Sequence, residues 1–330
     1  MHNYSEMILY VAYNLENQKQ KISVGLIRQN MIWEADKSVI FESEIKHLIE
    51  KGYLLKEDNR LSLTNKGRIE AARISKAMIK DEFSKKIDRL TRSSAYLDFC
   101  EEVYGYRVYL FNMMDKQQID FVLGSIPVSA EDTILDLGCG SGSILKLLVK
   151  KYGCRGIGID QLNGDILERT SMAITYINGD IDRISDYSLN PTVTLSIDSL
   201  YFSKDLDKLV RQLNSIENSK MYLFYSQYIF DEVFGDKSIL NSHNTKIADI
   251  LNKNNISFKT IDYSENERLL YENSLKALKK YKRTFEVEGN LDLYEQKLKE
   301  DTTGLELYDK NLASRYLYII GAAAERKKTN

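Results

Sequence analysis

The stretch Thr133-Ile134-Leu135-Asp136-Leu137-Gly138-Cys139-Gly140-Ser141-Gly142 decides the fold. A short apolar run with β character ends in an acidic residue, and three alternate glycines follow it. Residues 143–151 have the composition of a helix, with Lys150 and Lys151 at its negative C-terminal end and Gly153 as a stop. Glycines let the backbone turn tightly and let a ligand approach N–H groups that a Cβ would block. The pattern predicts a strand, a loop and a helix that together form a nucleotide-binding cradle.

A second buried strand, Gly156-Ile157-Gly158-Ile159-Asp160, follows the predicted helix and ends in a carboxylate. In a βαβ unit, an acid at that place accepts hydrogen bonds from ribose hydroxyls. The loop has neither the Gly-Lys-Ser/Thr ending of a phosphate-binding loop nor the Gly-x-Gly-x-x-Gly spacing of a dinucleotide-binding domain. Asp136 would also repel a pyrophosphate, whereas it could receive a cationic amino acid group.

Four motifs in this order resemble those of class I S-adenosylmethionine-dependent methyltransferases. Residues 136–142 and 156–160 resemble the first two motifs, Ile177-Asn178-Gly179-Asp180 the third, and residues 192–202 the fourth-strand motif. The resemblance implies an α/β fold with a seven-stranded Rossmann-like sheet whose last strand is antiparallel. It implies S-adenosyl-L-methionine as cofactor, S-adenosyl-L-homocysteine as product, and no metal.

The resemblance also implies which residues contact the cofactor. It places the methionine end at the backbone of Gly138 and Gly140, near Asp136. It places the ribose at Asp160 and the adenine at Asp180. The full set of residues expected to contact the cofactor is Asp136, Gly138, Gly140, Gly142, Asp160, Gln161, Asp180, Ile181 and Asp198.

The residues just past the fourth strand are expected to line the transfer site. Ser199 and Tyr201 are candidate substrate contacts, and so are Tyr104, Tyr106 and Asn112 from the segment before the first motif. Three residues are candidates for the general base: Asp198, Tyr201 and His243. His243 is the only histidine in the predicted core.

The composition is that of a soluble globular protein, with 43% hydrophobic and 28% charged residues among 330. The net charge of −2 gives no overall attraction to nucleic acid or to an anionic membrane. No long apolar run or signal segment is evident, so a cytoplasmic location is expected. Three cysteines form neither an even disulfide framework nor a paired metal motif.

Residues 1–90 resemble a winged-helix domain, because helical segments precede a hairpin of two β runs around the polar turn 57–60. Up to Arg92 the chain has 17 basic and 13 acidic residues. The helix expected at 41–51 carries three glutamates, which oppose DNA phosphates. A dimerisation or substrate-lid domain, and with it a homodimer, is therefore favoured over DNA binding.

Residues 91–130 are expected to form a helical bridge over the cofactor, with its second helix at Asn112–Leu123. Residues 131–330 form the predicted cofactor domain, in which strands alternate with helices and a cap is inserted at about 264–312. The expected helices of this domain include 163–171, 238–253, 266–283, 291–299 and 304–311.

Several substrate classes can be excluded from the sequence. No Asp/Asn-Pro-Pro-Tyr motif follows the fourth strand, no Pro-Cys pair occurs, and no basic stripe marks an RNA groove. A small molecule or a peptide natural product remains, methylated on N or O. The tyrosines of the bridge and cap favour methylation on nitrogen, since aromatic faces attract cationic amines. The alternatives are a DNA-binding regulator with a metabolite-sensing methyltransferase domain and a protein methyltransferase.

Overall fold

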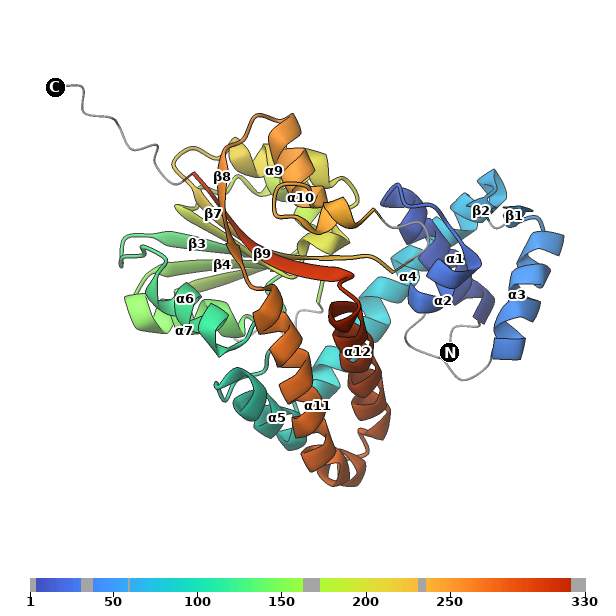
Figure 1. Ribbon diagram of the computed structural model, residues 1–330. Helices are drawn as coiled ribbons and strands as arrows, with labels where there is room; N and C mark the ends of the chain where they lie inside the picture. Colours follow the sequence, from blue (N-terminus) through green and yellow to red (C-terminus); the bar gives the residue numbers. More distant parts are fainter. Residues whose placement is uncertain (1–3, 31–37, 59, 163–172, 231–235, 322–330) are drawn as a thin grey trace.

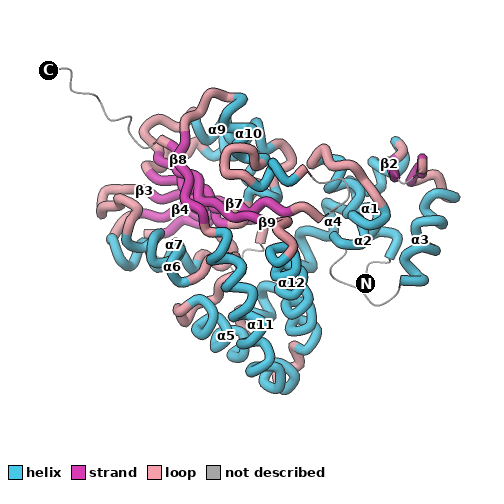
Figure 2. The backbone as a smooth tube through the Cα atoms, in the orientation of Figure 1, coloured by secondary structure: helices cyan, strands magenta, loops and turns pink. Residues whose placement is uncertain are grey.

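The computed structural model describes residues 4–30, 38–58, 60–162, 173–230 and 236–321. Figure 1 shows a twisted sheet with helices on both faces, a helical lobe beneath it and an N-terminal unit at one side. The tube view in Figure 2 shows that strands gather in the sheet and that the lobe is all helix. Within the described residues, no helix is long and apolar enough to cross a membrane.

The sheet has seven strands in the order β5-β4-β3-β6-β7-β9-β8. Neighbours from β5 to β7 run parallel, whereas β9 is antiparallel to both β7 and β8. This confirms the expected seven-stranded, Rossmann-like α/β arrangement. The strands are β3 (Thr133–Leu137), β4 (Arg155–Asp160), β5 (Ile174–Asn178), β6 (Val193–Ile197), β7 (Lys220–Tyr228), β8 (Phe258–Asp262) and β9 (Ala313–Ile320).

Alternate residues of the central strands enter two separate cores. Phe224 of β7 faces one core, and its neighbours Leu223 and Tyr225 face the other. The first core includes side chains from α5 (Ser94–Tyr104), α6 (Lys116–Gly124), α7 (Ser143–Tyr152), α11 (Ser264–Val287) and α12 (Leu291–Asp309). The second includes side chains from α9 (Leu206–Asn214) and α10 (Lys246–Lys253). Burial on both faces explains why these strands have apolar residues at consecutive positions, as at Ile134-Leu135 of β3 and Leu223-Phe224 of β7.

The N-terminal unit has a small core of its own. It consists of α1 (Tyr4–Asn17), α2 (Val24–Asn30), α3 (Ser38–Glu50), the strands β1 (Leu54–Glu57) and β2 (Arg60–Leu63), and the start of α4 (Asn65–Leu90). The predicted hairpin is confirmed, since β1 and β2 pair antiparallel. Ile22 also forms an isolated bridge with Leu61. Thr64 begins α4 by accepting a hydrogen bond from the Gly67 N–H.

The predicted cap consists of two long antiparallel helices, α11 and α12, placed between β8 and β9. The expectation of two short helices after α11 is wrong, because α12 runs unbroken through Gly304. A Cβ at Gly304 would lie 2.4 Å from the Tyr271 ring of α11. Glycine therefore permits close helix packing here rather than a break.

Two further helix boundaries differ from the expected ones. The helix predicted at 112–123 begins only at Lys116, because Asp115 caps it by accepting the Gln118 N–H. The helix predicted at 238–253 is interrupted. A 3-10 turn, η3 (Lys237–Leu240), precedes α10, which Thr245 caps. The helix predicted at 163–171 lies outside the described residues.

Substitution of Gly304 by Ala is expected to destabilise the protein by about 1–3 kcal/mol, the usual cost of overpacking a dense interior. The added methyl overlaps the Tyr271 ring, which is 3% exposed and held by its hydroxyl. Gly124→Ala at the end of α6 is the control, since nothing lies within 4 Å of its Cβ position. That control is expected to be neutral or slightly stabilising. Urea unfolding of both variants measures the difference; equal stabilities would contradict the packing argument.

Candidate active site

The glycine loop between β3 and α7 has three residues with positive φ: Gly138 at +69°, Gly140 at +54° and Gly142 at +70°. A Cβ at Gly138 would lie 2.3 Å from the Cβ of Ser199. A Cβ at Gly140 would meet only Phe111, at 3.9 Å. The loop is therefore packed against the end of β6 at Gly138 and open to close approach at Gly140.

Gly142 differs from the other two glycines because a side chain already lies beside it. The Tyr176 hydroxyl of β5 would be 2.2 Å from a Cβ at this position. This hydroxyl is buried and has no hydrogen-bond partner in the described part of the chain. Burial raises the pKa of Tyr176. Gly142 thus provides space for an aromatic ring under the first turn of α7.

Two carboxylates meet at the loop. Asp136 is 3% exposed, and burial, followed by the nearby Asp160, raises its pKa to about 7. Burial also raises the pKa of Asp160, although it accepts hydrogen bonds from the N–H groups of Gly140 (2.8 Å) and Leu162 (3.0 Å). No cationic side chain of the described residues contributes to either pKa shift. The site is therefore electrostatically suited to a positively charged ligand.

The other predicted cofactor residues lie around the ends of β4 and β5. Gln161 is exposed and directly follows Asp160. Asp180 caps a 3-10 helix, η1 (Ile181–Tyr187), and its carboxylate lies 3.2 Å from the Lys204 ammonium. Ile181 is buried in the second core. Residues 163–172, which follow Gln161, are not described.

Asp198 lies just past the end of β6, with a φ of +53°. Its two carboxylate oxygens accept hydrogen bonds from the Arg315 guanidinium at 2.6 and 3.0 Å. One of them also accepts the Met113 N–H at 2.7 Å. Arg315 itself is fully buried. The candidate base is thus held in a bidentate ion pair, which does not leave it free to collect a proton.

Ser199 and Tyr201 are hydrogen-bonded within the protein. Ser199 is 3% exposed, and its hydroxyl donates to the Leu137 carbonyl. The Tyr201 hydroxyl accepts the Ser226 N–H at 2.6 Å, and its ring lies 4.9 Å from that of Tyr225. Burial, followed by Asp198, raises the pKa of Tyr201 well above its ordinary value. The phenol therefore stays protonated near neutral pH.

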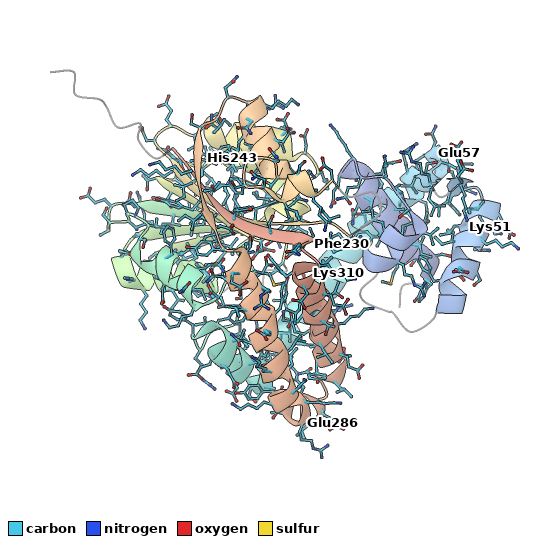
Figure 3. All side chains as sticks on the ribbon, viewed as in Figure 1. Lys51, Glu57, Phe230, His243, Glu286 and Lys310 are labelled. Carbon is cyan, nitrogen blue, oxygen red and sulfur yellow. The ribbon has the colours of Figure 1, made fainter. Side chains whose placement is uncertain are left out.

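The structure does not bring His243 together with the glycine loop. His243 is exposed, and its ring lies 5.6 Å from Phe258 at the start of the edge strand β8. In the sheet β6, β7 and β9 separate β3 from β8, a distance of roughly 19 Å at about 4.8 Å per strand. Figure 3 shows His243 on the side of the sheet with α10.

The residues between α5 and α6, 105–115, form a segment that we call the strap. The Tyr96 hydroxyl of α5 donates to the Leu110 carbonyl, and the Ser141 hydroxyl of the glycine loop donates to the Tyr109 carbonyl at 3.2 Å. The Phe111 ring stacks on Tyr96. The strap thus joins the helical lobe to the glycine loop.

The predicted substrate residues of this region have different surroundings. Tyr104 is 1% exposed, and its hydroxyl donates to the Asn112 carbonyl at 3.3 Å. The Asn112 side chain accepts the Met114 N–H. Tyr106 is more accessible and donates to Asp120, which raises its pKa to about 12. Tyr104 and Asn112 therefore fix the strap, whereas Tyr106 lies toward the surface.

Sequence reasoning missed a cluster around Glu267 of α11, which is fully buried. Its carboxylate accepts hydrogen bonds from the hydroxyls of Ser226, Tyr228, Tyr271 and Tyr308. Arg315 lies 4.0 Å away. An arginine inside the apolar run 313–320 was the available signal, because a buried guanidinium needs acidic partners.

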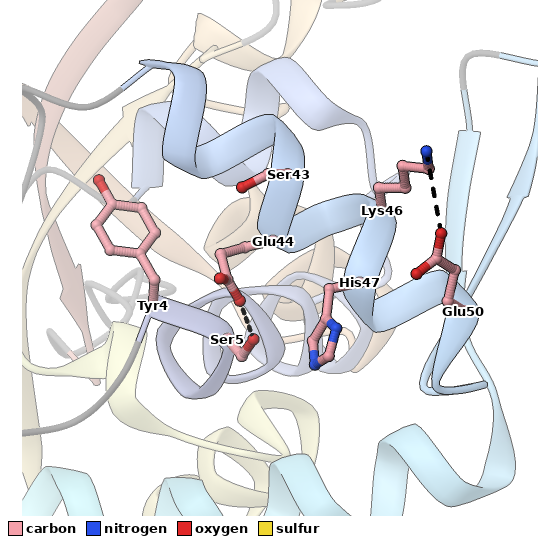
Figure 4. A pocket seen from close by; sticks show the side chains of 7 residues that line it. All are labelled: Tyr4, Ser5, Ser43, Glu44, Lys46, His47 and Glu50. Atoms are coloured by element: carbon pink, nitrogen blue, oxygen red, sulfur yellow. Dashed lines mark hydrogen bonds and ion pairs between the residues drawn. The ribbon is translucent and has the colours of Figure 1, made fainter.

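A separate hollow of about 580 Å³ lies between α1 and α3 of the N-terminal unit (Figure 4). In it Ser5 donates a hydrogen bond to Glu44, and Lys46 pairs with Glu50 at 4.0 Å. Tyr4, Ser43 and His47 complete its lining. Among the described residues, no group of three or more His, Cys, Asp or Glu could hold a metal ion.

Solved structures with the same fold place this arrangement in a known class. Phosphoethanolamine N-methyltransferase 2 of Haemonchus contortus, solved with phosphomonomethylethanolamine and S-adenosylhomocysteine, matches with a TM-score of 0.57 at 14% identity, covering 86% of this chain and 74% of that one. The cyclopropane synthase MmaA2 of Mycobacterium tuberculosis matches with a TM-score of 0.54 at 11% identity, covering 74% and 99%. The chain therefore has the fold of S-adenosylmethionine-dependent methyltransferases.

Two further comparisons agree with this fold. The mycolic acid cyclopropane synthase CmaA1, solved with S-adenosylhomocysteine, matches with a TM-score of 0.53 at 15% identity, covering 73% of this chain and 99% of that one. The profile of the family described as methionine biosynthesis protein MetW matches residues 118–210, which include β3 to β6. No curated protein sequence matches the chain.

Proposed function

We propose that the protein is an S-adenosylmethionine-dependent methyltransferase. The observation that carries the proposal is the pair of carboxylates beside a glycine loop that is open at Gly140: Asp136, which is buried, and Asp160, which is half-buried and has its pKa raised by desolvation. A buried acid with a second, half-buried acid beside it, and no cationic side chain among the causes of either pKa shift, fits a ligand with sulfonium and ammonium charges. When bound, this cofactor supplies an electrophilic methyl group.

The residues proposed to hold the cofactor follow the strand ends. The backbone at Gly138 and Gly140, with Asp136, would receive the amino acid end, and Gly142 completes the loop. Asp160 would accept the ribose hydroxyls. Asp180 and Ile181 would lie at the adenine, beside Gln161.

A small molecule or short peptide with an amine acceptor is the proposed substrate. A neutral amine is nucleophilic without a base, whereas a hydroxyl must lose a proton. The ion pair of Asp198 and the raised pKa of Tyr201 support an acceptor that needs no base. N-methylation is therefore favoured over O-methylation.

For residues 1–90 we propose a winged-helix-like domain that acts in dimerisation or as a lid. Three helices, the hairpin and the bridge between Ile22 and Leu61 support this topology. A DNA-binding regulator is the second candidate, and salt-dependent binding of duplex DNA by the full chain would favour it. The exposed Glu42 and Glu50 of α3 weigh against it.

Asp160→Ala is expected to weaken the binding of S-adenosylhomocysteine by about 1.5–3 kcal/mol, the range for hydrogen bonds to a charged group. Asp186→Ala is the control, because Asp186 pairs only with Arg183 in the described residues and is half-exposed. Isothermal titration calorimetry of both variants measures the effect. Unchanged affinity in Asp160→Ala would contradict the site assignment.

The activity itself is tested with methyl-labelled S-adenosylmethionine and a cell extract. We expect label in the small-molecule fraction, on nitrogen. Label in the protein fraction would instead indicate a protein methyltransferase. Cofactor binding without any transfer would favour the sensing regulator.

A further inference from the structure

Arg315 of β9 contacts four different elements with its side chain. Its Nη atoms donate to Asp198 after β6, and Nη1 also donates to the Ser226 hydroxyl of β7 at 2.8 Å. Its Nε donates to the Gln118 amide oxygen of α6 at 2.7 Å. Glu267 of α11 lies 4.0 Å from Nη1. The guanidinium thus occupies the point where the sheet, the strap region and the cap meet.

The charges around Arg315 explain how it can be buried. Burial would by itself lower the pKa of Arg315, but Asp198 and Glu267 raise it well above its ordinary value. A planar guanidinium can bind the carboxylate through two parallel hydrogen bonds and still donate to other acceptors, which an ammonium cannot do in that geometry. Because the Arg315 guanidinium hydrogen-bonds to several side chains at once, it fixes the positions of those side chains relative to one another.

The connection to the strap passes through Asp198. Its oxygen Oδ2 accepts from both Arg315 and the Met113 N–H. Met113 follows Tyr109, whose carbonyl accepts a hydrogen bond from Ser141 of the glycine loop, and Phe111, whose ring lies beside Gly140. Fixing Asp198 therefore fixes the C-terminal half of the strap.

The connection to the cap passes through Ser226. Its hydroxyl accepts from Arg315 and donates to Glu267 of α11 at 2.7 Å. Glu267 in turn accepts from Tyr308 of α12, so both cap helices are tied to this carboxylate. The backbone adds a further link, because the Tyr263 N–H before α11 donates to the Arg315 carbonyl at 2.9 Å.

We propose that Arg315 is a positioning residue that couples the cap to the strap at the C-terminal ends of β6 and β7. We call this region the transfer edge, because the proposed function puts methyl transfer there. Its side chain fixes the Asp198 carboxylate, which accepts the Met113 N–H of the strap, so that Asp198 does not act as a base. Through Ser226 it also fixes the Glu267 carboxylate, to which the cap helices are hydrogen-bonded. The role of the strap in cofactor binding rests on the proposed function, whereas the coupling itself does not.

Arg315→Lys tests the coupling, because lysine keeps the charge but cannot make the bidentate contact. Arg89→Lys is the matched control: Arg89 pairs with Asp292 through two 2.7 Å hydrogen bonds, at the far end of the cap. We expect hydrogen exchange of residues 105–115 to become at least about tenfold faster in Arg315→Lys only. We also expect its affinity for S-adenosylhomocysteine to fall about tenfold, with exchange in β3 unchanged.

Asp198→Asn keeps the test valid if Arg315→Lys does not fold. Asparagine has the same size and one acceptor oxygen, so we expect the strap to exchange faster than in the wild type but more slowly than in Asp198→Ala. The proposal would be overturned if the hydrogen-exchange rates of the strap in all these variants equalled the rates in Arg89→Lys. If the wild type does not bind S-adenosylhomocysteine while strap exchange responds as expected, the proposed function fails and the coupling stands.

Discussion

Replacement of Asp136 by Asn is expected to stabilise the ligand-free protein and to weaken its binding of S-adenosylmethionine. Asp136 is 3% exposed, and its pKa is raised from 3.8 to about 7. The folded protein therefore binds this proton more tightly than the unfolded chain does. The contribution of Asp136 to stability falls as the pH rises from about 4, and the loss is complete above pH 7.

The size of this effect follows from the two pKa values. Each unit of pKa difference corresponds to about 1.4 kcal/mol, so the loss is on the order of 4 kcal/mol at pH 8 and less than half of that at pH 5. The advantage of Asn over Asp in the free energy of unfolding should therefore grow by about 2–3 kcal/mol between these pH values. Urea unfolding at pH 5 and pH 8 measures it; a constant difference would contradict the burial of a charged carboxylate.

Binding should change in the opposite direction. A cationic ligand stabilises the charged form of Asp136, so wild-type affinity for S-adenosylmethionine should rise between pH 6 and pH 8. The Asn variant should lack this part of the pH dependence and bind roughly 10–100-fold more weakly, the equivalent of about 1.5–3 kcal/mol. Titration of the ligand itself is common to both proteins and cancels in the comparison.

Gly138→Ala is expected to have the other large effect. The residue has a φ of +69°, and its new methyl would lie 2.3 Å from the Cβ of Ser199. The left-handed backbone costs about 1–2 kcal/mol for a non-glycine residue, and overpacking adds about 1–3 kcal/mol. Chemical denaturation should therefore show a loss of about 2–5 kcal/mol, accompanied by loss of cofactor binding.

A matched substitution separates the two costs. Gly153 has the same φ of +69°, but the nearest atom to its Cβ position is 3.9 Å away. Gly153→Ala should therefore show the backbone cost alone. Adding Ser199→Gly to Gly138→Ala removes the atom that is overlapped, and it should recover part of the stability. A Gly138 variant no less stable than the Gly153 variant would refute the close contact between the loop and β6.

The sheet and the glycine loop could be predicted from sequence because their signals are local. The apolar run before Asp136, the alternate glycines and the acid at Asp160 each belong to a few consecutive residues. The structure confirms the seven-stranded sheet with its antiparallel last strand and places Asp136 and Asp160 together. The roles of these residues toward the cofactor remain predictions.

The surroundings of the transfer edge could not be predicted in the same way. Asp198 and Arg315 are 117 positions apart, and no local pattern indicates that they form a pair. The continuity of α12 was also hidden, because Gly304 resembles a helix end until the Tyr271 ring is seen beside it. Ser199 lies just past the end of β6, as the fourth-strand motif predicts, but its hydroxyl donates to the Leu137 carbonyl.

The position of β9 has a consequence for the order in which the protein is assembled. Strand β8 reaches the sheet only through β9, and β9 follows the whole cap in the chain. During synthesis β7 therefore has an unpaired edge until residues 313–320 have left the ribosome, and such edges favour aggregation. Arg315 arrives with that strand, so Asp198 and Glu267 lack their shared cation until then. The glycine loop can form early, whereas the transfer edge is completed last.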